Sequence, residues 1–200
     1  LEKAARVLAV GHTRRIDVGS ATVDTPTRRI QRYFDNNMGI GLEGAVIIES
    51  NRIRRLQGLP LYLLAAAKSL MAKGYPWMRV QWESSYGELT QREGPFLIIS
   101  IGNSARAGGG FPLTPKARMD DGALDLLLAN DMSRPERFAM MPMTLFGKHV
   151  THRQVTMATF RRLEATIAAG APVQLDGEVL ATDATAVQVV VLPSRLDVVV

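Results

Sequence analysis

The sequence predicts a mainly β protein, a β-sandwich with a few inserted helices, and three observations support this prediction. Apolar and polar residues alternate along several short segments, most clearly from Leu163 to Ile167, as expected of half-buried strands. Turn residues separate these segments, as Asp-Gly does within VQLDGEVL at residues 173–180. Helical periodicity occurs in only three places, without the regular strand–helix alternation of a parallel α/β fold.

The first third of the chain predicts a helix, two strands and a pair of helices. Residues 1–10 are amphipathic and begin without a capping residue, which suggests a helix cut from a longer chain. Residues 14–19 and 28–41 alternate like strands. From residue 42 to 73 apolar residues recur three and four positions apart, which predicts two helices broken at Gly58-Leu59-Pro60.

The remainder predicts strands and one further helix. Strand patterns at residues 77–83 and 94–103 are followed by a glycine-rich loop, and then by a turn that leads into a strand at 120–129. Ser133 is a typical helix cap, because Pro and Glu follow it in the first turn and methionines recur beyond them. After Gly147 the pattern predicts strands throughout.

Composition narrows the classes of function. The 200 residues are 46% hydrophobic and contain no cysteine, which allows a substantial core and excludes disulfides and thiolate metal sites. The net charge is +5, and the arginines form small clusters that suit either solvated faces or attraction to an anionic lipid surface. Nucleic acid is not an expected partner, because aromatic residues are only 6% and do not alternate with these clusters. The most apolar run, LPLYLLAAAKSLMA, contains Lys68 and is too short to span a bilayer.

Two motifs resemble ligand sites, and their context favours a structural role. GIGLEG at residues 39–44 matches the dinucleotide pattern G-x-G-x-x-G, but neither a βαβ unit nor the acidic residue about twenty positions later is present. We therefore expect close backbone approach at a corner between a strand and a helix. His149 and His152 have a spacing suited to metal ligands, but no third ligand is evident, so a polar loop is expected.

Two acidic turns suit either a purely structural role or a role in ligand binding or catalysis. Asp120-Asp121-Gly122 suits a plain turn or a Mg²⁺ or Ca²⁺ site, since carboxylates and backbone carbonyls are oxygen ligands. Asp176-Gly177 favours a type I′ hairpin turn, with Glu178 beginning the return strand. In a functional version, Glu178 would take a proton from a hydroxyl nucleophile while the neighbouring carboxylate organises the site.

Taken in order, several segments resemble one family. They are RRIDVG, NNMGIG, GNSARAGGGFPLTPKARMDDGALDL and VQLDGEVL. Together they resemble, over essentially the whole chain, the C-terminal domain of the diacylglycerol kinase-like lipid kinases. That family includes bacterial diacylglycerol kinases and YegS-type lipid kinases and, more distantly, sphingosine and ceramide kinases. The resemblance implies the C-terminal domain of the NAD kinase/diacylglycerol kinase-like fold.

The resemblance also implies a division into two domains. In the family an N-terminal α/β domain binds ATP through a Gly-Gly-Asp-Gly-Thr loop, and a C-terminal β-sandwich carries the lipid pocket. No such loop occurs in this sequence. We therefore expect residues 1–12 to be the remnant of an interdomain helix or linker, and residues 13–200 to form the lipid-binding sandwich. The ATP-binding domain is expected to be absent from this chain.

The resemblance assigns roles to individual residues. Glu178 matches the family's general base on the lipid hydroxyl, with Asp176 beside it in the turn. Asp121 matches the acidic residue of a structural divalent-cation site, which the carbonyls at Met119 and Leu124 share. The expected residues of the cleft are Asn37, Gly41, Asn103, Gly108, Gly109 and Gly110.

One departure from the family pattern bears on the substrate. Sphingosine kinases carry an acidic residue that reads the substrate amine, and the matching position here is Ile47. Because a cationic amine would have no partner there, a neutral hydroxyl lipid such as diacylglycerol is favoured. The helices at 42–73 and the methionine-rich helix are then candidate walls for acyl chains, or ordinary core packing.

The expected function is the lipid-binding half, carrying the catalytic base, of an ATP-dependent lipid kinase, inactive as a separate fragment. Mg²⁺ would accompany ATP, and Mg²⁺ or Ca²⁺ would occupy the site at Asp121. The expected partners are a lipid substrate at a membrane surface and the missing ATP-binding domain, in a cytoplasmic, peripherally membrane-associated protein; a homodimer is left open. The alternatives are an NAD kinase-like domain and a non-catalytic sandwich that binds lipid or an anionic surface.

Overall fold

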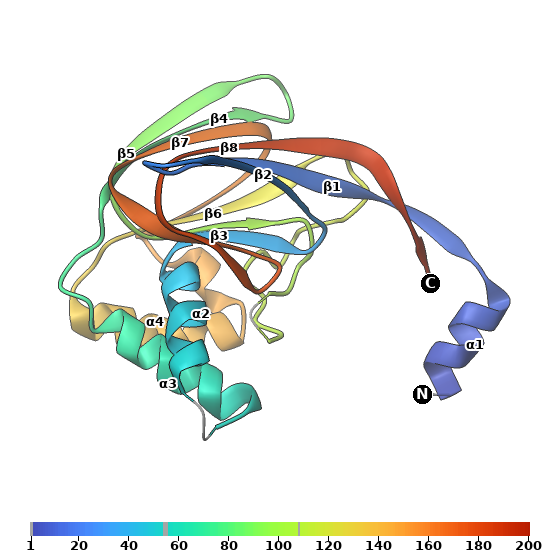
Figure 1. Cartoon of the computed structure of the whole chain (residues 1–200), viewed down its shortest axis with the longest axis horizontal. Coiled ribbons are helices and arrows are strands. Elements are labelled where there is room, and N and C mark those ends of the chain that lie inside the picture. The colour runs from blue at the N-terminus through green and yellow to red at the C-terminus, as the bar shows by residue number, and fades with distance from the viewer. Residues whose placement is uncertain (1, 54–55, 108) are drawn as a thin grey trace.

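In the part of the chain that the structure describes, eight antiparallel strands form a sandwich of two layers, which confirms the predicted fold class (Figure 1). The computed structural model describes residues 2–53, 56–107 and 109–200. The strands are β1 (Thr13–Asp24), β2 (Arg29–Phe34), β3 (Asn37–Gly41), β4 (Trp77–Ser84), β5 (Leu89–Gly102), β6 (Leu124–Asn130), β7 (Val155–Leu175) and β8 (Glu178–Val199). The helices are α1 (Glu2–Val10), α2 (Leu42–Arg52), α3 (Gly58–Leu70), α4 (Arg134–Leu145) and the short 3₁₀ helix η1 (Lys148–Thr151).

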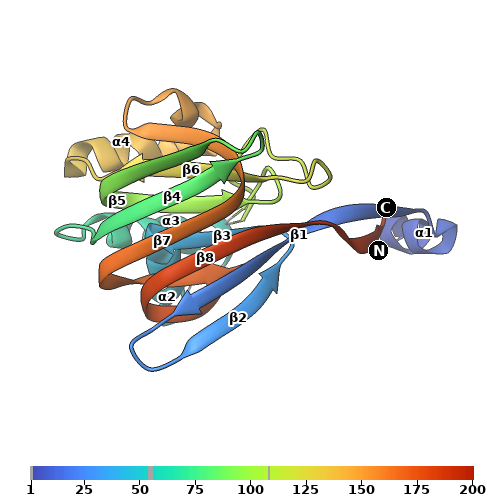
Figure 2. The ribbon, with the colours of Figure 1, turned by 90° about the horizontal axis from the view of Figure 1, so that it is seen from above.

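The two layers are joined because long strands pass from one layer into the other. One layer has the order β2-β1-β8-β7-β4 (Figure 2). Residues 89–95 of β5 pair with β4, whereas residues 96–102 pair with β6 in the second layer. β7 also pairs with β4 along its middle and with β3 near its end. Bulges at the changes of register bend both strands.

One apolar core fills the space between the layers, and alternation along the strands creates it. Leu124, Leu126 and Leu128 of β6 face this core. Leu127 and Ala129 of the same strand lie on the opposite face, against the helices. Because both faces of β6 are covered, residues 126–129 form an uninterrupted apolar run rather than an alternating pattern.

The helices α2, α3 and α4 cover the outer face of the layer that contains β3, β5 and β6 (Figure 1). Val46 of α2 packs with Ala65 and Ala66 of α3. α4 begins at the predicted cap, where the backbone N–H of Ser133 donates to Glu136 Oε2 at 3.1 Å. α1 lies far from this helical layer, beyond the end of the β1–β8 ribbon (Figures 1 and 2). Within the described ranges, no helix is long and apolar enough to cross a membrane.

Three local predictions need correction. Residues 28–41 form two strands, β2 and β3, because the chain turns at Asp35 and Asn36. The break between α2 and α3 lies before Gly58, which begins α3, and Pro60 falls in the first turn, where a missing N–H costs little. Residues 148–151 form η1 rather than strand.

Candidate functional site

The predicted acidic hairpin is a type I′ turn. Asp176 and Gly177 have φ angles of 47° and 88°, so both lie in the left-handed region that this turn requires. Leu175 at the end of β7 pairs with Glu178 at the start of β8. The hairpin interpretation of Asp-Gly-Glu is therefore confirmed.

The carboxylate of Asp176 holds the turn between β2 and β3. It accepts the backbone N–H groups of Asp35 at 3.1 Å, Asn36 at 3.1 Å and Asn37 at 2.8 Å. Asp176 also donates its own N–H to the carbonyl of Asn37. Partial burial raises the pKa of Asp176, the three amides lower it, and the nearby charge of Asp35 raises it. Asp176 thus links two distant turns into one rim.

Glu178 is exposed beside this rim. In the part of the chain that the structure describes, its carboxylate has no hydrogen bond and no ion pair within the protein. An exposed carboxylate of this kind is open to a partner that approaches from solvent. The role of Glu178 as a general base stays a prediction.

Beneath the rim lies a buried carboxyl group, that of Glu43 at the start of α2, which is only 6% exposed. Its Oε2 accepts the side-chain N–H groups of Asn37 at 2.8 Å and Gln174 at 3.0 Å, and Gln174 in turn accepts the N–H of Gly177 at 2.9 Å. Its Oε1 is buried without a hydrogen-bond partner. Burial raises the pKa of Glu43 to about 7, although the two amides and the nearby side chain of Ser100, which makes no hydrogen bond to Glu43 in the structure, lower it.

The glycines of GIGLEG make room for Glu43 and for α2. A Cβ atom at Gly39 would lie 2.5 Å from Glu43 Cβ and Cδ, so only glycine leaves space for this side chain. Gly41 has a φ of 83° at the corner between β3 and α2, and a Cβ at Gly44 would lie 2.8 Å from the backbone of Pro172. The expected close approach at a strand–helix corner is confirmed.

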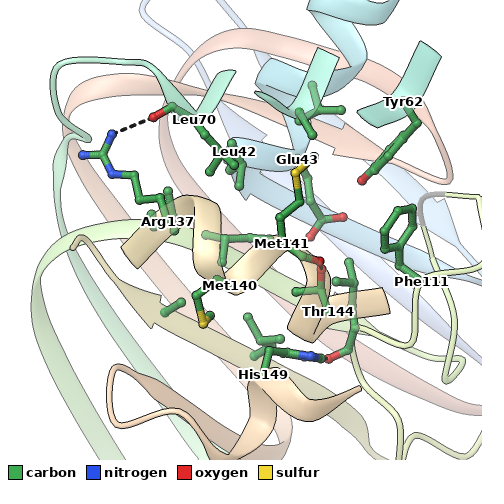
Figure 3. A pocket seen from close by; sticks show the side chains of 17 residues that line it. Leu42, Glu43, Tyr62, Leu70, Phe111, Arg137, Met140, Met141, Thr144 and His149 are labelled. Carbon is green, nitrogen blue, oxygen red and sulfur yellow. Dashed lines mark hydrogen bonds between the residues drawn. The ribbon is translucent and has the colours of Figure 1, made fainter. Parts of the chain in front are cut away.

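Two cavities meet at Glu43. A polar cavity of about 240 Å³ lies between Glu43, Gln174 and the Asp176–Gly177 turn. An apolar cavity of about 80 Å³ lies between the helical layer and the sheet, lined by residues such as Leu70, Leu97 and Met140. Glu43 and Tyr62 line both cavities, and Figure 3 shows their polar ends extending into the space between the helices. The sequence signal for Glu43 was an acidic residue within the apolar start of a helix.

The structure also shows where the methionine-rich helix and His149 lie. Met140 and Met141 of α4 line the apolar cavity, and their role as walls for acyl chains stays a prediction. His149 is buried in η1, where its Nε2 lies 3.0 Å from the carbonyl oxygen of Leu113. This burial lowers the pKa of His149. Because the residue is buried in a 3₁₀ helix, the expectation of a polar loop was wrong for it.

The predicted cation site contains a second carboxylate that sequence reasoning did not single out. Asp125 lies near Asp121 at the start of β6, and burial first and the charge of Asp121 second raise the pKa of Asp125 to about 6. Met119 presents its carbonyl to the N–H of Asp17 at 2.6 Å, and Leu124 begins β6. A divalent cation would relieve the repulsion between the carboxylates, so the donor set fits such an ion. Among the described residues no three acidic or histidine side chains converge, so carbonyls or water would complete the shell.

The remaining predicted cleft residues differ in where they lie. Asn103 is structural, because its Nδ2 donates to the carbonyls of Asp17 at 2.8 Å and Asp35 at 2.7 Å, which ties β5 to the β2–β3 turn. Ile47 and Gly109 line the polar cavity. Gly41 forms the corner between β3 and α2, and the carbonyl of Gly110 accepts a hydrogen bond from Arg106. Gly108 lies outside the described residues.

Comparison with known proteins gives consistent relatives. The family model of the YegS C-terminal NAD kinase beta sandwich-like domain matches residues 36–200. A protein named "Probable lipid kinase YegS-like" from Chromohalobacter salexigens is 30% identical over 88% of this chain and 53% of its own length. The diacylglycerol kinase of Staphylococcus carnosus is 24% identical over 88% of this chain and 54% of its own length. The chain therefore spans about half the length of these relatives.

Solved structures share the fold. A crystal structure of a diacylglycerol kinase from Bacillus anthracis str. Sterne has a TM-score of 0.62 at 17% identity, covering 98% of this chain and 57% of that one. Yeast NADH kinase in complex with NADH has a TM-score of 0.51 at 8% identity, with coverage of 98% and 46%. At these identities the likeness shows the fold alone. With the family match over residues 36–200, the chain belongs to the YegS and diacylglycerol kinase family of lipid kinases, as their C-terminal β-sandwich domain.

Proposed function

We propose that this chain is the lipid-binding half of an ATP-dependent kinase that phosphorylates a neutral hydroxyl lipid of the diacylglycerol class. The observation that carries the proposal is the junction at Glu43 and Tyr62, where a polar cavity under the Asp176–Gly177 turn adjoins an apolar cavity. Such a pair of spaces suits an amphiphile whose polar end lies toward the turn and whose chains lie among the helices. The names of the relatives support the same class of substrate.

Each element of the site has a proposed part in phosphoryl transfer. Glu178, at the exposed rim, would take the proton of the lipid hydroxyl as that oxygen attacks the terminal phosphate of ATP. Asp176 would hold the rim in place through its three backbone hydrogen bonds. Mg²⁺ bound with ATP would neutralise charge on the phosphates. Asp121 and Asp125, with the carbonyls of Met119 and Leu124, would hold a structural Mg²⁺ or Ca²⁺.

The nucleotide is proposed to come from a second domain. The chain spans about half the length of the kinases it resembles, and no Gly-Gly-Asp-Gly-Thr segment occurs in its sequence. We propose a cytoplasmic enzyme that associates with membranes peripherally, and the net charge of +5 supports attraction to anionic lipid surfaces.

The proposal is tested by transfer of labelled phosphate from ATP to dioctanoylglycerol, using this chain joined to its ATP-binding domain, with NAD as the competing acceptor. We expect labelled lipid and unlabelled NAD. Glu178→Gln should lower kcat by about 10²- to 10⁴-fold, whereas Glu164→Gln on the outer face of β7 should not. Transfer to NAD instead of lipid, or lipid binding without any transfer, would reject the kinase assignment.

A further inference from the structure

We infer that Glu43 recognises an acyl ester of the lipid by donating a hydrogen bond from Oε1 to the ester carbonyl oxygen. This inference rests on the proposed function and specifies how the site selects its substrate. It concerns a residue that is distinct from the rim carboxylates Asp176 and Glu178. Glu43 would act as a binding residue and leave the hydroxyl proton to the base at the rim.

The position of Glu43 corresponds to the position of the esters in a diacylglycerol. In such a lipid the ester groups lie between the hydroxyl and the acyl chains. In the protein Glu43 lies between the polar cavity beneath Asp176 and Gly177 and the apolar cavity beside Met140. A lipid that placed its hydroxyl toward the rim and its chains among the helices would bring its esters to Glu43.

The hydrogen bonds of Glu43 determine which oxygen is free for a ligand. Oε2 accepts two N–H groups, from Asn37 and Gln174, so negative charge is stabilised on this oxygen. Oε1 is buried and has no hydrogen-bond partner, so a proton held by the carboxyl group belongs there. A buried carboxylic acid that remains neutral is a hydrogen-bond donor, and an ester offers only acceptors.

The surroundings keep this donor fixed in place. Any side chain at Gly39 would collide with Glu43, and the two amides hold Oε2 from the other side. The titratable or charged groups that line the same two cavities are Tyr62, Arg137, His149 and Asp176. Burial raises the pKa of Glu43 to about 7, and burial raises that of Tyr62 while lowering that of His149. The pKa of Asp176 is also raised.

The test compares an ester lipid with an ether lipid that lacks only the carbonyl groups. Binding of dioctanoylglycerol and of dioctylglycerol to the chain is measured by calorimetry at pH 6 and pH 8.5. At pH 6 we expect the ester to bind about five- to tenfold more tightly, the value of one neutral hydrogen bond. At pH 8.5 Glu43 has lost its proton, and the preference should fall below about twofold.

Variants separate this role from a structural one. Glu43→Gln places an amide N–H near the position of Oε1, so the ester preference should survive at both pH values. Glu43→Met removes the donor and should abolish the preference at both. Glu49→Gln is the matched control, because Glu49 lies on the same helix but pairs with Lys68 of α3 and lines neither cavity, so this variant should behave like the wild type. Thermal unfolding checks that each variant is folded. If Glu43→Met does not fold, the change in the ester preference of the wild type between pH 6 and pH 8.5 tests the inference by itself.

The outcomes are distinguishable. An ester preference in the wild type that stays constant or grows from pH 6 to pH 8.5 would overturn the inference, because the donor would then be a different group. Equal binding of both lipids at pH 6 would overturn it while leaving the proposed function intact. Failure of both lipids to bind would remove the proposed function and this inference together.

Discussion

Glu43 and Gly39 make a close packing contact that the sequence around either residue does not predict. Gly39 is one of several small or apolar residues in β3, and Glu43 is one acidic residue in α2. In the folded protein a Cβ at position 39 would lie 2.5 Å from the Glu43 side chain. Sequence reasoning assigned the glycines correctly to close packing but did not identify what was packed, because a contact across a strand–helix corner has no periodic signal.

The buried carboxyl predicts a specific dependence of stability on pH. The pKa of Glu43 is about 7 in the folded protein and 4.5 ordinarily, so between these values the folded state holds a proton that the unfolded state has lost. Stability should therefore fall as pH rises from 4.5 to 7 and then level off. Relative to Glu43→Gln, the wild type should lose about 3 kcal/mol of unfolding free energy between pH 4.5 and pH 8.

Urea unfolding of both proteins at several pH values measures this difference. Other titrating groups affect both proteins equally, so the difference isolates Glu43. A difference that is constant with pH would show that Glu43 titrates near its ordinary value and stays ionised in the folded protein.

The turn of the β7–β8 hairpin requires two properties of the residue at position 176. The residue must adopt a φ of 47°, and its carboxylate must accept three backbone N–H groups of the β2–β3 turn. Alanine is strained at this φ and has no acceptor oxygen, so Asp176→Ala should lower the unfolding free energy by about 2–3 kcal/mol. Asp176→Asn tolerates the left-handed conformation and keeps one acceptor oxygen, so it should lose less than about 1 kcal/mol.

The two variants are compared by their urea midpoints at pH 7. Equal loss of stability in Asp176→Asn and Asp176→Ala would mean that the full carboxylate, rather than the backbone conformation, accounts for the effect. Equal stability of Asp176→Ala and the wild type would show that the β2–β3 turn does not depend on this hairpin.

Among the elements, those with local signals were predictable and those fixed by distant contacts were not. Alternation predicted most strands because one of their faces is buried, and Ser133 predicted the start of α4. The turn at Asp35 was missed because its stabilising carboxylate comes from Asp176, 141 residues later. The helix η1 was missed because its buried His149 is fixed by Leu113, on a different segment.

At the scale of the whole molecule, the apolar cavity beneath the helices is small. Its volume of about 80 Å³ holds only a few methylene groups, so binding of an acyl chain requires the helical layer to move outward. Arg137 of α4 donates to the carbonyls of Leu70 at 3.0 Å and Ala72 at 2.7 Å, which fastens α4 to the end of α3. We expect these two helices to shift as one body when a lipid enters, since breaking these buried hydrogen bonds would be costly.

Filling the cavity separates its role in lipid binding from a role in stability. Ala66 of α3 is buried against this cavity, and Ala66→Met adds about three non-hydrogen atoms of an adaptable side chain to it. Because the space is already present, the unfolding free energy should change by less than about 1.5 kcal/mol. Affinity for dioctanoylglycerol should fall about tenfold or more, since the added atoms occupy the space of the acyl chain. Ala168→Met on the exposed face of β7 is the control and should change neither quantity. Unchanged affinity in folded Ala66→Met would place the acyl chains elsewhere, and the helices α2, α3 and α4 would then be ordinary packing over the sheet.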